Sequence, residues 1–126
     1  MQVKLFYNLP MKESVLKTKA FNFSIKVINS YNKFLVNKND STIAKQLLRS
    51  STSIGANINE ALYAVSRADF ISKLHISLKE CGESLYWLEL LKNVNIKENF
   101  DDLIRSCKEL RTLLTKSIKT AKSNLE

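Results

Sequence analysis

The stretch SSTSIGANINEA, residues 50–61, decides how this chain folds. It begins with four hydroxyl side chains and also holds a glycine and two asparagines, a composition typical of a loop. Apolar residues nevertheless continue through it at helical spacing, from Ile43 to Val65, without a change of phase. At about 100° per residue these positions stay on one side of a helix. The stretch is therefore predicted to lie inside a helix, with Ser51 and Gly55 on or near its core face.

Gly55 and three polar residues give this predicted helix an unusual surface. A glycine within a helix costs roughly 0.5–1 kcal/mol relative to alanine, so we expect Gly55 to mark the close approach of a neighbouring backbone. Ser53, Asn57 and Glu60 form a polar facet beside the core face. We interpret this facet first as an interhelical or intersubunit hydrogen-bond set, and only second as a ligand site.

Three further amphipathic segments are expected, at about residues 14–36, 67–93 and 98–122. Asp40 or Ser41 is a candidate N-cap of the second helix, and Ser66, with Asp69 three residues later, resembles a capping box before the third. The apolar stripes of these segments predict a core at Leu16, Ala20, Phe23, Val27, Tyr31 and Phe34, then Phe70, Ile71, Leu74, Leu78, Cys81, Leu85 and Leu88, and finally Phe100, Ile104, Cys107, Leu110, Leu114, Ile118, Ala121 and Leu125.

Composition and length favour one all-α domain. The chain has 126 residues, 44% of them hydrophobic, with only two glycines and one proline. Scarce turn residues argue against an all-β design. Four amphipathic helices joined by short connections fold most simply as an antiparallel up-down-up-down four-helix bundle. We therefore expect a single four-helix bundle domain over residues 1–126, whose first eleven residues form an N-terminal arm.

The first and third predicted helices carry apolar residues on two sides. Phe21 and Ile28 form a second stripe on the first helix, and Ile76, Trp87 and Leu90 project away from the core stripe of the third. A helix that is apolar on two faces needs a second partner. We therefore predict that these five residues lie in the interface of a homo-oligomer.

Charge is concentrated at the two ends of the chain. The formal net charge is +8, and residues 1–38 hold seven lysines against one glutamate. The last predicted helix carries a basic arc of six residues: Arg105, Lys108, Arg111, Lys116, Lys119 and Lys122. This arc has two interpretations, a solvated face whose lysines suit the helix dipole, or a surface that follows the phosphates of RNA or DNA.

Catalytic chemistry finds little support in the sequence. His75 is the only histidine, and SSTSIGAN holds one glycine rather than the glycine-rich loop that cradles phosphates. Cys81 and Cys107 have no Cys or His at metal-binding spacing, so we interpret them as small buried hydrophobes. No enzyme activity, metal, cofactor or small-molecule substrate is predicted.

Targeting signals are also lacking in the sequence. No apolar run is long enough to span a membrane, and the first residues make a poor signal peptide. We therefore expect a cytoplasmic protein with reduced thiols and no membrane partner.

Several motifs resemble the bacterial four-helix bundle proteins that were first found as open reading frames inside intervening sequences of 23S ribosomal RNA genes. The first signature matches at Ser53, Ile54, Gly55, Ala56, Asn57, Ile58, Glu60 and Ala61. Asp69, Phe70 and Lys73 follow, and the run Lys-Glu-x-x-Glu-x-x-Tyr-Trp-Leu matches at Lys79, Glu80, Glu83, Tyr86, Trp87 and Leu88. The likeness covers nearly the whole chain and is most specific over residues 47–91.

This resemblance implies a bundle that assembles as a ring, typically a homopentamer, without enzymatic activity and with a supposed association with ribosomal RNA. Together with the charge, it favours an oligomeric bundle that binds ribosomal or other structured RNA through its phosphates. The alternative is a protein-interaction scaffold with no nucleic-acid role, in which the charge is incidental.

Overall fold

The computed structural model describes residues 10–35, 41–94 and 97–123, and these residues hold helices and no strand. Helix α2 spans Pro10–Ser30 and continues into a π-helical turn, η1, at Tyr31–Leu35. Helices α3, α4 and α5 span Ser41–Ala61, Arg67–Asn93 and Asp101–Ser123. The all-α class is confirmed. None of the described helices is long and apolar enough to cross a membrane.

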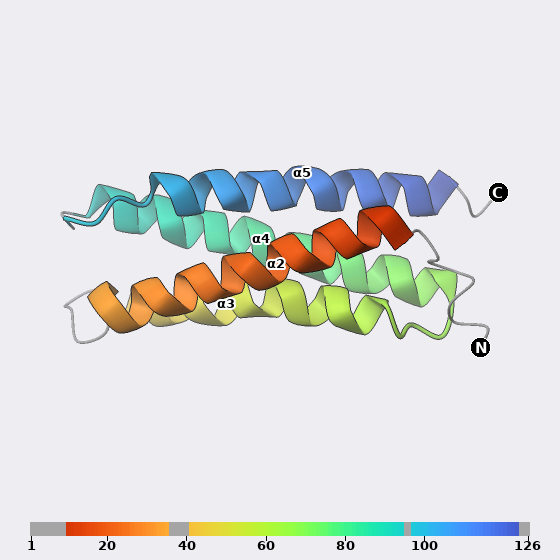
Figure 1. The fold of residues 1–126 in the computed structure, drawn as a ribbon, viewed down its shortest axis with the longest axis horizontal. Helices are drawn as coiled ribbons and strands as arrows, with labels where there is room; N and C mark the ends of the chain where they lie inside the picture. The colour runs from red at the N-terminus through yellow and green to blue at the C-terminus, as the bar shows by residue number, and fades with distance from the viewer. Residues whose placement is uncertain (1–9, 36–40, 95–96, 124–126) are drawn as a thin grey trace.

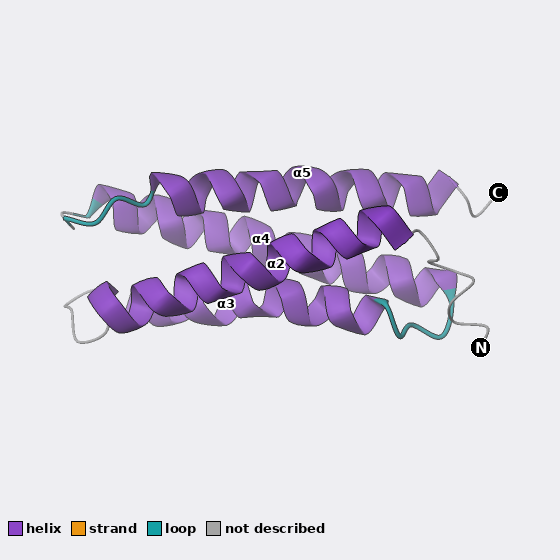
Figure 2. Cartoon of the chain, in the orientation of Figure 1, coloured by secondary structure: helices purple, strands orange, loops and turns teal. Residues whose placement is uncertain are grey.

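Successive helices run in opposite directions along one long axis (Figure 1). Helices account for nearly all of the described chain, and the teal segments that join them are short (Figure 2). Both α2 and α4 pack against α3 and α5, so α2 and α4 occupy diagonal positions in the bundle. This is the up-down-up-down four-helix bundle that the sequence predicts.

The buried residues alternate in steps of three and four along each helix. On α4 they are Phe70, Leu74, Ser77, Cys81, Ser84, Leu88 and Leu91, with Ile71 beside them. Such strict alternation is the pattern of coiled-coil packing, in which the helices cross at small angles. Leu78 and Leu85, which were expected in the core, are only half-buried, because the 3.5-residue period places Ser77 and Ser84 on the inward line instead.

Residues 50–61 form the second half of α3, as predicted, but the helix ends at Ala61 rather than continuing to Val65. The amides of Tyr63 and Ala64 bond to carbonyls three residues earlier, which closes tight turns after the helix. Val65 is therefore 79% exposed, and the expectation that it continues the core stripe is wrong. Gly55 faces α2 as expected, since an added Cβ would lie 3.7 Å from the Ala20 Cβ.

Helix starts follow capping chemistry. The Ser66 hydroxyl accepts a hydrogen bond from the Asp69 amide at 3.0 Å and caps α4 as predicted, while the Asp69 carboxylate accepts from the amide of Val65. Helix α5 starts at Asp101 rather than near residue 98, because the Asn99 side chain accepts the Asp101 amide in a local turn. Helix α2 starts at Pro10 rather than near residue 14, a position that suits proline's missing amide hydrogen.

Some expectations fall outside the described residues: the arm up to residue 9, the cap at Asp40, and Leu125. The side chain of Phe34 is likewise not described.

Serine side chains link the helices inside the bundle. The hydroxyls of Ser50 on α3 and Ser84 on α4, both fully buried, lie 2.7 Å apart. The Ser77 hydroxyl donates to the Ile54 carbonyl at 2.8 Å, again joining α4 to α3. Small side chains allow α3 and α4 to approach closely, and this is the most extensive helix pairing in the fold.

Candidate nucleic-acid interface

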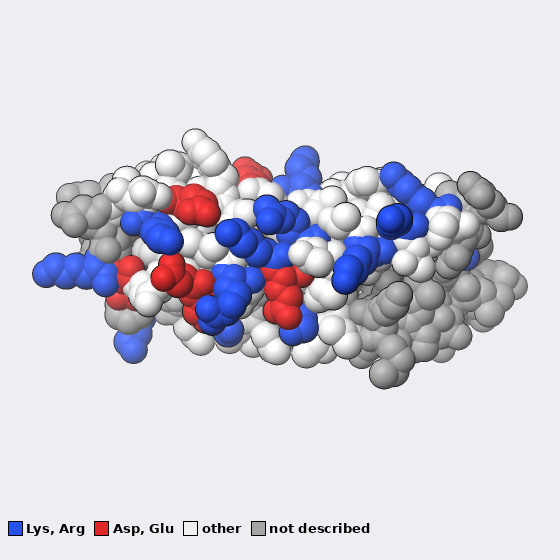
Figure 3. Space-filling model, turned by 90° about the horizontal axis from the view of Figure 1, so that it is seen from above, with Lys and Arg blue, Asp and Glu red and all other residues white. Residues whose placement is uncertain are grey.

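The six basic residues predicted as a binding surface all lie exposed along one side of α5. Their outward placement follows from the inward line of Leu103, Cys107, Leu110 and Leu114 on the same helix. After Glu109, α5 carries no acidic residue up to its end at Ser123. In Figure 3, which looks down on α5, blue side chains accordingly stand without red ones toward one end of the molecule.

Only one of the six basic residues of α5 forms an ion pair with a described residue. Arg105 lies 2.7 Å from the carboxylate of Asp102, which also pairs with Lys26 of α2 at 3.2 Å. The Lys26 ammonium lowers the pKa of the Asp102 carboxyl, and Arg105 adds to that effect. The other five residues form no ion pair with any residue that the structure describes. We call Lys108, Arg111, Lys116, Lys119 and Lys122 the basic face.

Helix α2 adds positive charge at the same end of the bundle. It runs antiparallel to α5, so its first turns lie beside the last turns of α5 (Figure 1). Lys17 is exposed on this part of α2 and has no ion-pair partner within the described ranges. Sequence reasoning located the charge on the first and last helices but did not place the two helices together.

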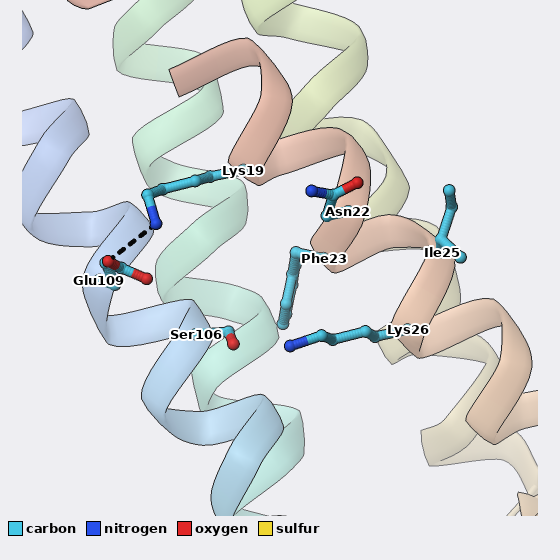
Figure 4. A pocket seen from close by; sticks show the side chains of 7 residues that line it. All are labelled: Lys19, Asn22, Phe23, Ile25, Lys26, Ser106 and Glu109. Carbon is cyan, nitrogen blue, oxygen red and sulfur yellow. Dashed lines mark ion pairs between the residues drawn. The ribbon is translucent and has the colours of Figure 1, made fainter. Parts of the chain in front are cut away.

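An open groove of about 380 Å³ lies between α2 and α5, farther from that end. Its lining residues are Lys19, Asn22, Phe23, Ile25, Lys26, Ser106 and Glu109, with Phe23 at its floor (Figure 4). Lys19 pairs with Glu109 across the groove at 3.0 Å, and Lys26 is held by Asp102. Because its charged groups neutralise one another, the groove is not part of the basic face.

A second polar cluster joins the other two helices. Arg49 of α3 lies 3.1 Å from Glu83 and 3.9 Å from Glu80 of α4. Burial raises the pKa of the Glu80 carboxyl, and the neighbouring Glu83 carboxylate raises it further. One oxygen of Glu80 and the indole nitrogen of Trp87 are buried without a hydrogen-bond partner among the described residues. The ring of Tyr86, itself exposed, meets Trp87 edge-on at 5.1 Å.

The remaining residues of the family signature lie along the same two helices. The Asn57 amide donates to the Ser53 carbonyl within α3, so this bond is not interhelical as expected. Glu60 does reach α4, at 3.8 Å from Lys73, whereas Lys79 is exposed. The buried hydrogen bonds between α3 and α4 instead come from Ser50, Ser77 and Ser84, which hydropathy patterning did not single out.

The residues predicted for an oligomer interface are unevenly exposed. Phe21 is 64% exposed on α2 and Ile28 is 38% exposed, with Ile25 between them. On α4, Ile76 is exposed, while Trp87 and Leu90 are half-buried. Trp87 packs against the core, so the expectation that it points away from the core is only partly right.

Metal-binding and catalytic groups do not gather in the described part of the chain. No group of three or more His, Cys, Asp or Glu residues could hold a metal ion there. His75 is exposed on α4. Cys81 and Cys107 are fully buried, as expected, but they also touch each other across α4 and α5, which their sequence spacing did not reveal.

The fold and these surfaces together define a class of small antiparallel helical bundles with a charged exterior and no assembled catalytic centre among the described residues. Similarity to known proteins identifies the family within that class. A family model described as 23S rRNA-intervening sequence protein matches residues 12–116, and the chain belongs to this family.

A solved structure supports the same assignment. The crystal structure of a protein with unknown function from the S23 ribosomal protein family of Bacteroides thetaiotaomicron is 46% identical. The match covers 86% of this chain and 99% of that one, with a TM-score of 0.76. No curated protein matches the chain. Neither the family nor the structural neighbour is described as an enzyme.

Proposed function

We propose that this protein is a non-enzymatic, oligomeric bundle that binds ribosomal RNA, or other structured nucleic acid, through the phosphates. The observation that carries the proposal is the basic face, whose five cations have no acidic partner in the described structure while the other charges of α5 are paired. Unpaired cations are free to exchange their counterions for phosphates. The family name, which refers to a 23S rRNA intervening sequence, points to the same class of ligand.

The geometry of the basic face suits a backbone contact rather than base readout. Lys108 and Lys122 are fourteen residues apart on one helix, a rise of about 21 Å. The four lysines, spread over such a length, can contact several successive phosphates, and Arg111 alone in the basic face has a planar fork that could pair with a base edge. Binding should therefore tolerate sequence changes and weaken steeply with salt, by about 0.7–0.9 in the logarithmic slope for each neutralised phosphate.

Self-association is the second part of the proposal. The large exposed apolar residues within helices lie on α2 and α4, the two helices at diagonal positions in the bundle. Two different surfaces on different sides of one subunit favour head-to-tail contact, which generates a ring when the rotation closes. We propose such a ring, with the five copies that the family resemblance implies. Repetition of the basic face around it would strengthen a weak contact through avidity.

The test compares two triple variants that remove equal charge. In the first, Lys116, Lys119 and Lys122 of the basic face become glutamine; in the second, the ion-paired Lys19, Lys26 and Arg105 do. Filter binding to a ribosomal RNA fragment at rising salt should show the larger loss of affinity for the first variant. The slope of log affinity against log salt concentration should fall in magnitude by about 2–3 for that variant. Equal losses would mean that only net charge matters, and no binding by the wild type near physiological salt would refute the proposal.

Light scattering on the same samples tests the ring. We expect an oligomer for the wild type and a smaller species for Phe21→Asp, since this side chain is 64% exposed in the single subunit and its replacement spares the core. A wild-type monomer at micromolar concentration would contradict self-association. A partner protein that stays bound after nuclease treatment, and after loss of the basic face, would favour the scaffold alternative.

A further inference from the structure

Cys81 of α4 and Cys107 of α5 form a reciprocal pair inside the bundle. Their sulfur atoms lie 3.7 Å apart. The Cys81 thiol lies 3.2 Å from the Cys107 carbonyl, and the Cys107 thiol lies 3.3 Å from the Cys81 carbonyl. Each thiol has one hydrogen, so it donates either to that carbonyl or to the other sulfur. The hydrogen of each thiol therefore has two possible acceptors, and in either case the two sulfur atoms are in contact.

We propose that Cys81 and Cys107 are a modification site, a dithiol that hydroperoxides oxidise to an intramolecular disulfide joining α4 to α5. A disulfide bond is about 2.05 Å long, so the sulfurs, now 3.7 Å apart, must approach by about 1.6 Å. Rotation of the two small side chains and a slight movement of the helices can supply this approach. The proposal does not depend on nucleic-acid binding or on the ring.

The contact between the two sulfurs acts in opposite directions on the pKa values of the two thiols. The hydrogen bond from Cys107 lowers the pKa of the Cys81 thiol against the opposing effect of burial, and the charge of Arg111 acts in the same direction. The same contact with Cys81, together with burial, raises the pKa of Cys107. The contacts are reciprocal in geometry, so the order of attack is part of the proposal: Cys81 attacks first, because the thiolate is the nucleophile, and Cys107 resolves.

The reaction then balances in two steps. The Cys81 thiolate attacks the outer oxygen of the hydroperoxide, the O–O bond breaks, and the departing alkoxide takes a proton to leave as an alcohol. Cys81 is now a sulfenic acid. The Cys107 sulfur attacks the Cys81 sulfur, the S–O bond breaks, and hydroxide leaves as water with the Cys107 proton. Two thiols lose two electrons, and one hydroperoxide gains them.

Gly82 is the position at which we expect α4 to open and admit an oxidant to the buried pair. It directly follows Cys81 on α4, it is exposed, and an added Cβ would meet no atom within 4 Å. Glycine weakens a helix interior, so α4 should open locally at this turn more readily than elsewhere. Gly55, the other glycine of the chain, lies in α3 against α2 and not beside a cysteine.

The experiment uses the full chain in its folded state with hydrogen peroxide as the oxidant. Intact mass spectrometry without reductant should show a monomeric chain lighter by two hydrogen atoms, with both thiols protected from alkylation in denaturant and recovered by a reductant. In Cys107→Ser this mass loss should vanish, and Cys81 should be trapped as a sulfenic acid by dimedone. Thiols that stay alkylatable in the wild type, or cross-links only between chains, would overturn the proposal.

The two glycines separate native-state oxidation from oxidation of the unfolded chain. Gly82→Ala should slow disulfide formation about fivefold, because it stabilises the turn that must open. Gly55→Ala is the matched control: its Cβ would meet only ordinary contacts, and it should stabilise the fold without changing the rate. If both variants slow oxidation equally, the reaction needs global unfolding and the site is not a feature of the native protein.

Discussion

Helices α3 and α4 meet along buried serines, whereas α2 and α5 meet around an open groove spanned by surface ion pairs. In Figure 1, α2 lies beside α5 at its start and diverges from it along its length. The signature residues of the family lie on α3 and α4, and the basic face lies on α5. The comparison teaches that one half of this bundle specifies the fold, while the other half carries the charge on which the proposed function rests.

The largest difference between the two interfaces should appear when a serine is enlarged. Ser84→Leu places a bulky side chain where α3 and α4 touch and removes the bond to Ser50, so we expect the free energy of unfolding to fall by about 3 kcal/mol. Ser106→Leu faces the groove between α2 and α5 and should change stability by less than about 1 kcal/mol. Urea denaturation measures both, and equal effects would break the comparison.

A smaller contrast is expected from single polar contacts. Ser77→Ala removes the buried hydrogen bond to the Ile54 carbonyl and should cost about 1 kcal/mol. Glu109→Gln removes an ion pair whose side chains are 53% and 42% exposed, and should cost about 0.5 kcal/mol or less. Urea denaturation of the two variants measures both losses of stability. A larger loss for Glu109→Gln would show that the ion pairs hold α2 more strongly than their exposure suggests.

The subtlest contrast is the sign of the pH dependence. Burial holds the pKa of Glu80 above its ordinary value of 4.5, so the folded state binds more protons at this residue than the unfolded state does. Stability therefore falls as pH rises from 4.5 through the raised pKa. Lys26 holds the pKa of Asp102 below its ordinary value of 3.8, so its contribution is present above that value and is lost as pH falls through the lowered pKa.

Two variants isolate these opposite slopes. Glu80→Gln should flatten the loss of stability above pH 4.5, and Asp102→Asn should weaken the loss on the acid side of pH 3.8. Denaturant titrations from about pH 3 to pH 7 would show both effects. If both variants changed stability over the same pH range, the opposite pKa shifts assigned to Glu80 and Asp102 would be wrong.

The helices themselves were predictable because each is long and carries a stripe of core residues at helical spacing, and the Ser66 cap was predictable because capping is local chemistry. Ser77 and Ser84 were missed because a pattern search ranks residues by apolarity, whereas the period of the packed bundle selects positions regardless of residue type. The helix end at Ala61 was missed for a related reason. Apolar residues kept their phase up to Val65, but the chain had to turn before the Ser66 cap.

The candidate site was predictable only in part. Exposure of the six basic residues follows from the pattern of α5 alone. Which of them are paired depends on the acids of α5 and on the neighbouring helix, as Asp102 shows by joining both Arg105 and Lys26. The contact between Cys81 and Cys107 likewise depends on the alignment of two helices, which their sequences do not state.

The serine contacts between α3 and α4 also bear on the order in which the chain folds. They join residues 23 to 34 positions apart, whereas the Lys26–Asp102 pair joins residues 76 positions apart. Closing a short loop costs less entropy and occurs sooner than closing a long one. Hairpins of helices that follow one another, such as α3–α4 and α4–α5, should therefore assemble before α2 meets α5. Helix α2 is the first of the described helices to leave the ribosome. It packs against both α3 and α5, so its packing is complete only after α5 has been synthesised.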